Sequence, residues 1–221
     1  MSNIGALQKD LDVDRYMGTW YEIAKYPTAF QVDCQRSVAV YEKLSQDLRD
    51  RTEELFCNTS EGSIFFSVLN KCMDTDGNVR RTISGVGEIR DKNNPAVISV
   101  SFEGVPDSGS SEGNYLVHYT NYEYAIVGSP DKATLFILAR NPVISESMYI
   151  SLKNRVRNLG YSPEKLVIDS GAVEIPRKSN PTSANGMNIF KMVEEASHSY
   201  LWWFLLLVIL LFLLIAAFML A

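Results

Sequence analysis

The stretch LDVDRYMGTWYEIAKY at residues 11–26 decides the fold of this chain. It contains a Gly-x-Trp motif, formed by Gly18 and Trp20, at the point where a turn-like segment becomes an aromatic strand of alternating character. Such alternation indicates a strand that buries one of its two faces. The motif is short, and it gains meaning from two later segments, GNYLVHYTNYEYAIVGSPDK at 113–132 and LFILARNP at 135–142.

Most of the chain consists of β-rich runs separated by turn residues. Such runs occur at 20–26, 36–44, 63–70, 79–90, 96–102, 114–119, 122–129 and 134–139. Eight antiparallel strands with short links can close into an up-and-down barrel that holds one small ligand. We therefore expect an all-β fold built on an eight-stranded antiparallel barrel, with an open sandwich as the alternative architecture.

A single helix is expected after the last strand, at residues 145–159. Its apolar residues are spaced three and four apart: Tyr149, Leu152, Val156 and Leu159. Ser145 is a good N-terminal cap, and Gly160 is a typical residue just beyond a helix end. We expect this helix to pack against the barrel and to complete a domain over residues 1–169.

The end of the chain has a different composition. Residues 201–221, LWWFLLLVILLFLLIAAFMLA, carry no charge, and a helix of this length spans about 30 Å of hydrocarbon. A globular helix normally keeps a polar face, so a transmembrane helix over 200–221 is favoured over a buried core helix. Residues 170–199 are rich in Ser, Asn, Pro and Gly, which indicates a flexible linker and a juxtamembrane stretch.

The net charge of the chain and the sequence of its first residues indicate which partners it can bind and where in the cell it lies. The net charge is −5, and none of it lies in the apolar tail. An acidic domain repels phosphate backbones, so we expect no nucleic-acid partner. The first residues, MSNIGALQKDLDVDRY, lack the basic and apolar regions of a signal peptide. We therefore expect a single-pass membrane protein whose C-terminal anchor inserts after synthesis and whose barrel domain faces the cytosol.

Three motifs together resemble the signature of the lipocalins. These are the Gly-x-Trp motif, the Thr-Asn-Tyr motif at Thr120–Tyr122, and Arg140 after the last long strand. The similarity is strongest to apolipoprotein D and to the bacterial outer-membrane lipocalins, and it covers about residues 9–169. The resemblance implies a calycin-type β-barrel with one C-terminal helix, to which this chain adds a transmembrane anchor.

The resemblance also implies structural roles for the motif residues. In lipocalins the motif tryptophan closes the barrel floor, and the arginine lies across its ring in a cation–π contact. Trp20 and Arg140 are expected to take these positions. Gly18 would permit a close approach of the entering chain, and Thr120 with Tyr122 would fix the hairpin near the same end.

The ligand-binding residues are carried over from the same resemblance. The positions that match the lining of the apolipoprotein D cavity are Tyr41, Asn70, Tyr115 and Phe136. Alternation places the members of three sets on common faces: Tyr115, Val117 and Tyr119; Phe136, Leu138 and Arg140; Phe66, Val68 and Asn70. An apolar wall with one amide and two phenols suits a ligand with a long hydrocarbon part and one polar group. The alternative is that these side chains simply fill a core.

The cysteines are open to two interpretations. If Leu44 pairs with Ser63 in the hairpin, Cys34 and Cys72 become near neighbours, although the insert at 45–62 can shift this register by a residue or two. The resulting disulfide would conflict with a reducing cytosol.

No metal site is expected, because the sequence around Asp74 lacks the glycine and glutamate of a calcium loop. Because side chains alternate between the two faces of a strand, His118 is expected to point opposite to Tyr115 and to lie outside the cavity.

Two classes of function remain, with a structural role as a third. The favoured one is a membrane-tethered lipocalin, without cofactor, that binds a fatty acid, lysophospholipid or similar lipid for uptake, storage or transfer. The alternative is a lipocalin-type isomerase acting on a lipid, which would need a reactive cysteine inside the cavity. A structural membrane or virion protein could also use the barrel as a scaffold. We expect a binding protein and not an enzyme.

Overall fold

The structure is a computed structural model of the whole chain, and it describes residues 6–28, 31–44, 62–102 and 113–174. The chain divides into two units, residues 1–176 and 177–221, and every described residue belongs to the first. The expected transmembrane helix at 200–221 and nearly all of the expected linker lie outside the described residues. Within the described ranges, no helix is both long enough and apolar enough to cross a membrane.

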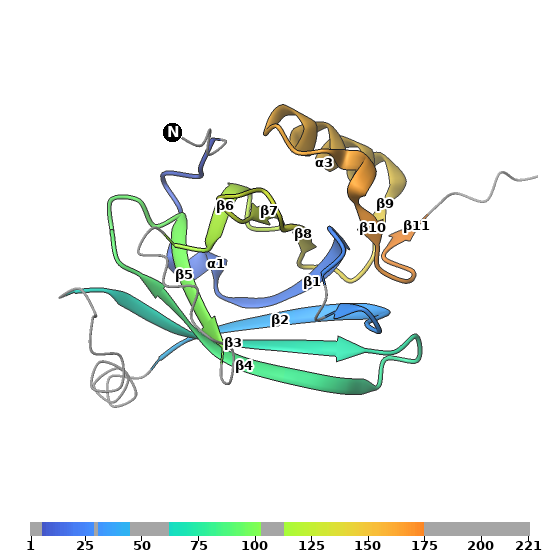
Figure 1. Cartoon of the computed structure of the whole chain (residues 1–221), viewed down its shortest axis with the longest axis horizontal. Coiled ribbons are helices and arrows are strands. Elements are labelled where there is room, and N and C mark those ends of the chain that lie inside the picture. Colours follow the sequence, from blue (N-terminus) through green and yellow to red (C-terminus); the bar gives the residue numbers. More distant parts are fainter. Residues whose placement is uncertain (1–5, 29–30, 45–61, 103–112, 175–221) are drawn as a thin grey trace, which may run out of the picture. The chain divides into compact units, whose positions relative to one another are not determined.

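Eight antiparallel strands of the nine-stranded main sheet follow one another in chain order around a barrel (Figure 1). They are β1 (Gly18–Lys25), β2 (Arg36–Lys43), β3 (Ile64–Met73), β4 (Val79–Ile89), β5 (Val97–Phe102), β6 (Tyr115–Thr120), β7 (Tyr124–Gly128) and β8 (Leu135–Ala139). β1 pairs with β2 on one edge and with β8 on the other, so the sheet closes on itself. The expected barrel is confirmed, and the open sandwich is wrong.

Two details of the register differ from simple alternation. Lys43 pairs with Phe66, so the β2–β3 hairpin is shifted by two residues from the Leu44–Ser63 pairing. In β6 the register shifts between Val117 and Tyr119. Because of this bulge, Tyr119 leaves the face of Tyr115 and Val117 and packs in the outer core beneath the helix. The expectation that Tyr119 shares the interior face is therefore wrong.

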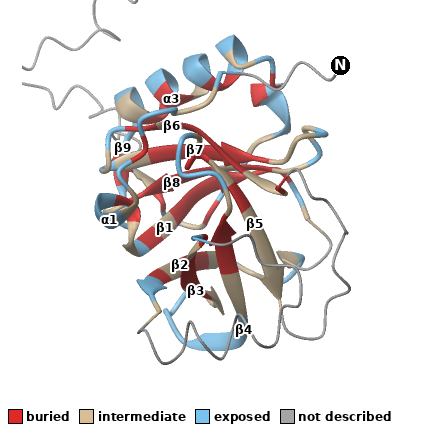
Figure 2. Ribbon diagram, turned by 90° about the vertical axis from the view of Figure 1, so that its left-hand side faces the viewer, coloured by how far each residue is buried: buried red, intermediate tan, exposed pale blue. Residues whose placement is uncertain are grey.

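The expected helix is confirmed as α3 (Glu146–Asn158). The Ser145 hydroxyl accepts a hydrogen bond from the Met148 amide, and Gly160 follows the helix with a φ of +79°. Tyr149, Leu152 and Val156 are buried against the outer face of the barrel, while the other side of the helix is exposed (Figure 2). The resulting outer core also contains Ile23, Ile126 and Ile137 from the strands.

The C-terminal segment of the described unit continues past residue 169. A short 3-10 turn, η2 (Pro163–Lys165), leads into β10 (Val167–Ile168), which pairs with Ala24 and Lys25 of β1. β11 (Val173–Glu174) then pairs in parallel with β9 (Ile144–Ser145). This segment ties the end of the domain to the strand that carries the Gly-x-Trp motif.

Candidate functional site

One end of the barrel is closed by a short helix that the sequence did not predict. α1 (Val13–Tyr16) begins at Asp12, whose side chain accepts hydrogen bonds from the amides of Asp14 and Arg15. The helix places the Tyr16 ring beside Trp20, with the ring centroids 5.2 Å apart. Both side chains are buried, so together they form the floor of the barrel.

Arg140 secures this floor from the outside. Its guanidinium carbon lies 3.7 Å from the centroid of the Trp20 ring. The same group donates hydrogen bonds to five backbone carbonyls, those of Arg15, Tyr16, Met17, Thr19 and Tyr122. Gly18 has a φ of +97°, and a Cβ there would lie 3.4 Å from an Arg140 nitrogen. The structural roles expected for Gly18, Trp20 and Arg140 agree with this geometry.

The Thr120–Tyr122 motif shapes the β6–β7 turn at the closed end. The Thr120 hydroxyl accepts a hydrogen bond from the Tyr122 amide and donates one to the Tyr124 carbonyl. Tyr122 takes a positive φ of 69°, and its hydroxyl accepts a hydrogen bond from the Asp12 amide. The turn is thereby tied to the start of α1, which is the hairpin role that the sequence indicated.

Three tyrosine hydroxyls meet above the floor. The Tyr115 oxygen lies 2.8 Å from that of Tyr16 and 3.2 Å from that of Tyr41. Burial raises the pKa of Tyr41 to about 12, and it raises the pKa of Tyr16 and Tyr115 well above the usual 10.0. All three groups are therefore neutral hydroxyls at physiological pH. Tyr41 and Tyr115 were expected to line the cavity, whereas the part played by Tyr16 was missed.

The barrel interior is lined by apolar side chains from several strands. Those that pack into one cluster with Trp20 include Tyr41, Phe66, Val68, Val100, Phe102, Tyr115 and Phe136. Gly85 and Gly87 of β4 make room for the larger rings, because a Cβ at Gly87 would lie 2.3 Å from the Phe66 ring. The structure therefore places Tyr41, Tyr115 and Phe136 on the interior wall.

Exposure changes along this wall. Trp20, Phe66 and Val68 are buried, whereas Val100, Phe102 and Phe136 are partly exposed. Asn70 lies two residues beyond Val68 on β3, pairs with Ala39 and Ile83, and is also partly exposed. Side chains of the interior wall are thus buried near the floor and partly exposed farther from it.

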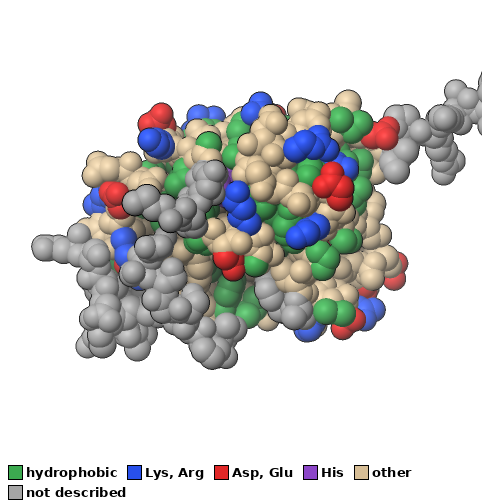
Figure 3. Space-filling view, turned by 45° about the horizontal axis from the view of Figure 1, so that its top comes forward, with side chains coloured by type: hydrophobic (Ala, Val, Ile, Leu, Met, Phe, Trp, Pro, Cys, Tyr) green, Lys and Arg blue, Asp and Glu red, His purple; other side chains and the backbone are tan. Residues whose placement is uncertain are grey.

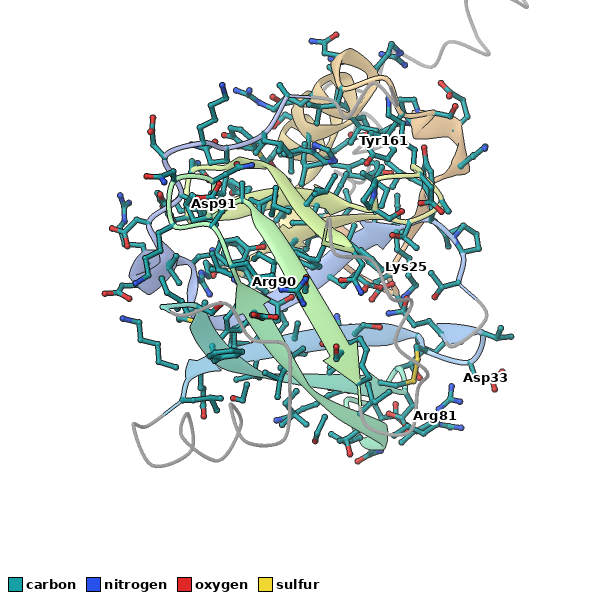
Figure 4. All side chains as sticks on the ribbon, turned by 60° about the vertical axis from the view of Figure 1, so that its left-hand side comes forward. Lys25, Asp33, Arg81, Arg90, Asp91 and Tyr161 are labelled. Carbon is teal, nitrogen blue, oxygen red and sulfur yellow. A yellow bond between two sulfur atoms is a disulfide. The ribbon has the colours of Figure 1, made fainter. Side chains whose placement is uncertain are left out.

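A cluster of charged side chains that the sequence did not single out lies at the open end, around Lys25, which is labelled in Figure 4. The Lys25 ammonium pairs with the Glu22 carboxylate and donates a 2.8 Å hydrogen bond to Asp169. Asp169 also accepts a hydrogen bond from the Ser37 amide. Burial, together with the charge of Glu22, raises the pKa of Asp169 to about 7. This cluster fastens the C-terminal segment between β1 and β2.

The Cys34–Cys72 disulfide lies at the same end of the barrel. The sulfur atoms are 2.08 Å apart, and Ser37 pairs with Cys72 across the β2–β3 hairpin. The proximity expected from the hairpin is confirmed. Disulfides persist in oxidising compartments, so this bond is at odds with the cytosolic barrel expected from the N-terminus. Cys57 lies outside the described residues.

His118 is on the outer side of β6, as alternation predicted. One ring nitrogen lies 2.8 Å from the Tyr161 hydroxyl and the other 3.0 Å from the Ala6 carbonyl. Burial lowers the pKa of His118, so the neutral ring serves as a link between the N-terminal segment and the chain after α3. Among the residues that the structure describes, no group of three or more His, Cys, Asp or Glu side chains could hold a metal ion.

The basic residues of α3 make local contacts. The Arg155 guanidinium lies 4.2 Å from the centroid of the Tyr119 ring, and Arg157 is 3.6 Å from Glu164. On the face seen in Figure 3, basic side chains are interspersed with apolar and acidic ones.

Comparison with known proteins agrees with this architecture. The model of the family described as "Lipocalin-like domain" matches residues 11–170. A putative lipocalin, R877, of Acanthamoeba polyphaga mimivirus is 35% identical over 160 residues, which cover 72% of this chain and 85% of that protein. Outer membrane lipoprotein Blc of Citrobacter freundii is 30% identical over 158 residues, covering 72% and 78%. Apolipoprotein D of Bos taurus is 27% identical over 170 residues, covering 73% and 78%.

The fold is also that of a solved structure, lobster apocrustacyanin A1. The TM-score is 0.50 at 14% sequence identity, over 76% of this chain and 88% of that one. A closed eight-stranded antiparallel barrel with one helix, a tryptophan floor and an arginine across it defines a class of small β-barrel proteins. The chain belongs to the lipocalin family. The expected similarity to apolipoprotein D and to the bacterial outer-membrane lipocalins is confirmed.

Proposed function

We propose that this lipocalin binds one small hydrophobic ligand, such as a fatty acid, lysophospholipid or similar lipid, inside the barrel. The observation that carries the proposal is the gradient of exposure along the interior wall. Side chains near Trp20 are buried, whereas Val100, Phe102 and Phe136 face the same interior and remain partly exposed. Apolar surface that is accessible inside a closed barrel suits a ligand with a long hydrocarbon part.

We further propose that residues 200–221 hold the barrel beside a membrane, so that it takes up, stores or transfers lipid there. The support is the uncharged apolar sequence of 201–221, together with the Ser-, Asn- and Pro-rich stretch that precedes it. A long-chain lipid spends most of its time in the bilayer, so a tether raises the local concentration of protein at the source of its ligand. The relatives named outer membrane lipoproteins are consistent with this location.

A binding protein is favoured over the isomerase because of the cysteines. A lipocalin-type isomerase would need a thiolate inside the cavity. Among the described residues, Cys34 and Cys72 are joined to each other at the open end, and neither can provide one while the disulfide is intact; the third cysteine, Cys57, lies outside the described residues. A scaffold role remains the alternative if the interior takes up no ligand.

The binding proposal is tested by filling the pocket from one strand. Val100 of β5 faces the interior, whereas Val86 of the neighbouring β4 pairs with Ser101 and faces outward. Val100→Trp should abolish binding of a fluorescent fatty-acid probe, because the indole occupies the space of the ligand. Val86→Trp is the matched control and should bind as the unaltered protein does.

Native mass spectrometry of the purified full chain should also detect a co-purified small lipid, and Val100→Trp should lose it. Equal probe binding by both tryptophan variants would contradict an interior site. Binding by neither variant, with both variants folded by circular dichroism, would also contradict it. Failure of the unaltered chain to bind the probe or to carry any lipid would favour the scaffold role.

A further inference from the structure

A pocket of about 360 Å³ lies on the rim at the open end of the barrel. Its lining comes from the end of β1, the β7–β8 turn and η2, namely Tyr26, Pro27, Lys132, Ala133 and Lys165. Since β1 and β7 both run from the floor toward the open end, these segments meet beside the mouth. The pocket is separate from the barrel interior, because none of its lining residues belongs to the cluster that contains Trp20.

Two buried tyrosine rings support the lysines of this pocket. The rings of Tyr26 and Tyr161, the second labelled in Figure 4, meet edge to face with their centroids 6.1 Å apart. The Tyr26 hydroxyl accepts a hydrogen bond from the Ser162 amide and donates one to the Ser162 carbonyl. The ammonium of Lys165 lies 5.9 Å from the centroid of the first ring, and that of Lys132 lies 5.4 Å from the centroid of the second. Both positive charges are thus placed over neighbouring rings.

Neither lysine has an acidic partner in the described part of the chain. None of the ion pairs among those residues includes Lys132 or Lys165. The contacts of the Lys132 ammonium there are with two backbone carbonyls, at the long distances of 3.4 and 3.5 Å. The pocket therefore carries two positive charges that no described carboxylate neutralises by direct contact.

The acidic groups next to these lysines in the chain have partners of their own. Asp131 accepts hydrogen bonds from a hydroxyl and an amide of the β7–β8 turn. Glu164 lies 3.6 Å from Arg157 of α3. Residues 125–168 include six basic and three acidic residues, a net charge of +3, although the whole chain carries −5. The part of the chain that forms most of the pocket is therefore positive and attracts anions.

Two exposed aliphatic side chains follow Lys165. Val167 and Ile168 of β10 are 50% and 42% exposed. Exposed aliphatic groups beside cations are typical of surfaces that lie on a lipid bilayer, where the cations contact head groups and the aliphatic groups reach the acyl boundary. A small soluble anion would use the lysines alone. The aliphatic pair therefore favours a membrane lipid as the source of the anion.

We propose that Lys132 and Lys165 bind the phosphodiester group of a membrane phospholipid, so that this pocket docks the open end of the barrel on an anionic bilayer. Ammonium groups bind phosphate as compact positive charges. Pro27 and Ala133 offer apolar surface to the glycerol carbons beside the phosphate. This inference rests on the proposed function, because it supplies the orientation that a flexible tether alone does not fix. The mouth of the barrel then faces the source of its ligand.

The test measures how fast individual lysines of the full chain are acetylated on vesicles, with mass spectrometry of peptides as the readout. One set of vesicles contains phosphatidylglycerol, and the other contains digalactosyldiacylglycerol, a lipid without phosphate. Phosphatidylglycerol should slow acetylation of Lys132 and Lys165 by about thirtyfold, which corresponds to roughly fivefold for each lysine near an anionic surface. The galactolipid should leave both lysines reactive.

Lys153 is the matched control for this measurement. Its ammonium also lies over a tyrosine ring, 5.7 Å from the centroid of Tyr149, but it belongs to α3 and not to the pocket. Acetylation of Lys153 should proceed at the same rate on both kinds of vesicle. A general effect of the anionic surface on lysine reactivity would slow Lys153 as well.

A pair of variants tests whether the two lysines act together. Lys132→Gln should make acetylation of Lys165 on phosphatidylglycerol vesicles roughly fivefold faster, because one charge holds the phosphate less tightly than two. Lys153→Gln should leave Lys165 protected. Both variants should bind a fluorescent fatty acid as the unaltered chain does, since neither residue belongs to the barrel interior.

Three results with the unaltered chain would overturn the inference, whether or not the variants fold. Equal acetylation rates of Lys132, Lys165 and Lys153 on phosphatidylglycerol vesicles would mean that the pocket does not touch the bilayer. Equal slowing on the galactolipid would mean that apolar contact, and not phosphate, holds this surface. Equal slowing by inorganic phosphate, with the chain kept in solution by an amphipathic polymer, would mean that a soluble anion is the ligand.

Failure of the proposed function gives different results. A full chain that does not float with galactolipid vesicles in a density gradient has no membrane tether, but acetylation in an excess of phosphatidylglycerol vesicles still decides whether the pocket docks. A full chain that binds no fluorescent fatty acid has no interior site. Selective protection of Lys132 and Lys165 would support docking in either case.

Discussion

The guanidinium of Arg140 lies over the Trp20 ring, with its carbon 3.7 Å from the centroid of the ring, although the two residues are 120 positions apart in the chain. A cation–π contact of this kind contributes about 0.5–2 kcal/mol. The carbonyls that Arg140 also binds belong to α1, β1 and the β6–β7 turn. One side chain thus joins the first and last strands of the barrel to the helix that closes it.

Trp20→Ala should destabilise the domain much more than Phe136→Ala. The Trp20 ring is fully buried in the floor, and its removal should lower the free energy of unfolding by about 3–5 kcal/mol. Phe136 is partly exposed on the pocket wall, so its truncation should cost less stability and should weaken binding of a fluorescent fatty acid. Thermal unfolding and probe titration of both variants separate the two roles. Equal losses of stability would contradict the division between floor and pocket.

Asp169→Asn should change how stability depends on pH. The pKa of Asp169 is about 7 in the folded protein, because of burial and the nearby charge of Glu22, against 3.8 for an ordinary aspartate. Between these values the folded state holds a proton that the unfolded chain has released, so stability falls as the pH rises from about 4 to about 7. A shift of this size corresponds to a fall of about 4 kcal/mol in the free energy of unfolding across this window.

Urea unfolding of both proteins at a series of pH values measures this effect. The difference in the free energy of unfolding between the two should change through this window and level off above about pH 7. The asparagine keeps one acceptor oxygen, for either Lys25 or the Ser37 amide, so one of the two hydrogen bonds is lost at every pH together with the titration. A constant difference across the window would mean that Asp169 keeps an ordinary pKa.

Removal of the disulfide should destabilise the barrel by about 2–4 kcal/mol. The bond closes a loop of 38 positions between Cys34 and Cys72, which includes the β2–β3 hairpin and the insert at 45–61. The double variant Cys34→Ser, Cys72→Ser should unfold at a lower urea concentration than the oxidised protein. The unaltered protein in excess reductant is the control and should resemble the variant. No response to reductant would show that the two thiols are not joined in solution.

Deletion of residues 200–221 should affect delivery of the ligand and not its affinity. The shortened chain should bind a soluble fluorescent fatty acid as tightly as the full chain, since the interior wall lies within residues 1–176. If residues 200–221 tether the barrel to a membrane as proposed, extraction of the same probe from vesicles should slow by roughly tenfold, because the shortened chain must reach the lipid by diffusion. Stopped-flow transfer of the probe from vesicles, at equal amounts of the two proteins, measures this difference. Equal rates would remove the lipid-handling role of the tail.

The sequence determined the strand pattern, the α3 boundaries and the pairing of Trp20 with Arg140 in the floor of the barrel. Strands and helices follow from local periodicity, and Ser145 and Gly160 mark the ends of α3 by their own backbone and capping chemistry. The roles of Gly18, Trp20 and Arg140 were expected because these residues match the lipocalin sequence motifs. The pairing of Cys34 with Cys72 followed from counting along one hairpin, although the register was two residues off.

Only the tertiary structure decided how distant side chains meet. A bulge in β6 turns Tyr119 away from the interior, and alternation cannot show such a change because it assumes an unbroken ladder. The contact of Tyr16 with Tyr115 joins residues 99 positions apart, and that of Lys25 with Asp169 joins residues 144 apart. No local sequence pattern indicates that residues so far apart in the chain are in contact. Closure of the barrel brings the tyrosines of the floor together, and the path of the chain after α3 brings Asp169 to Lys25 at the open end.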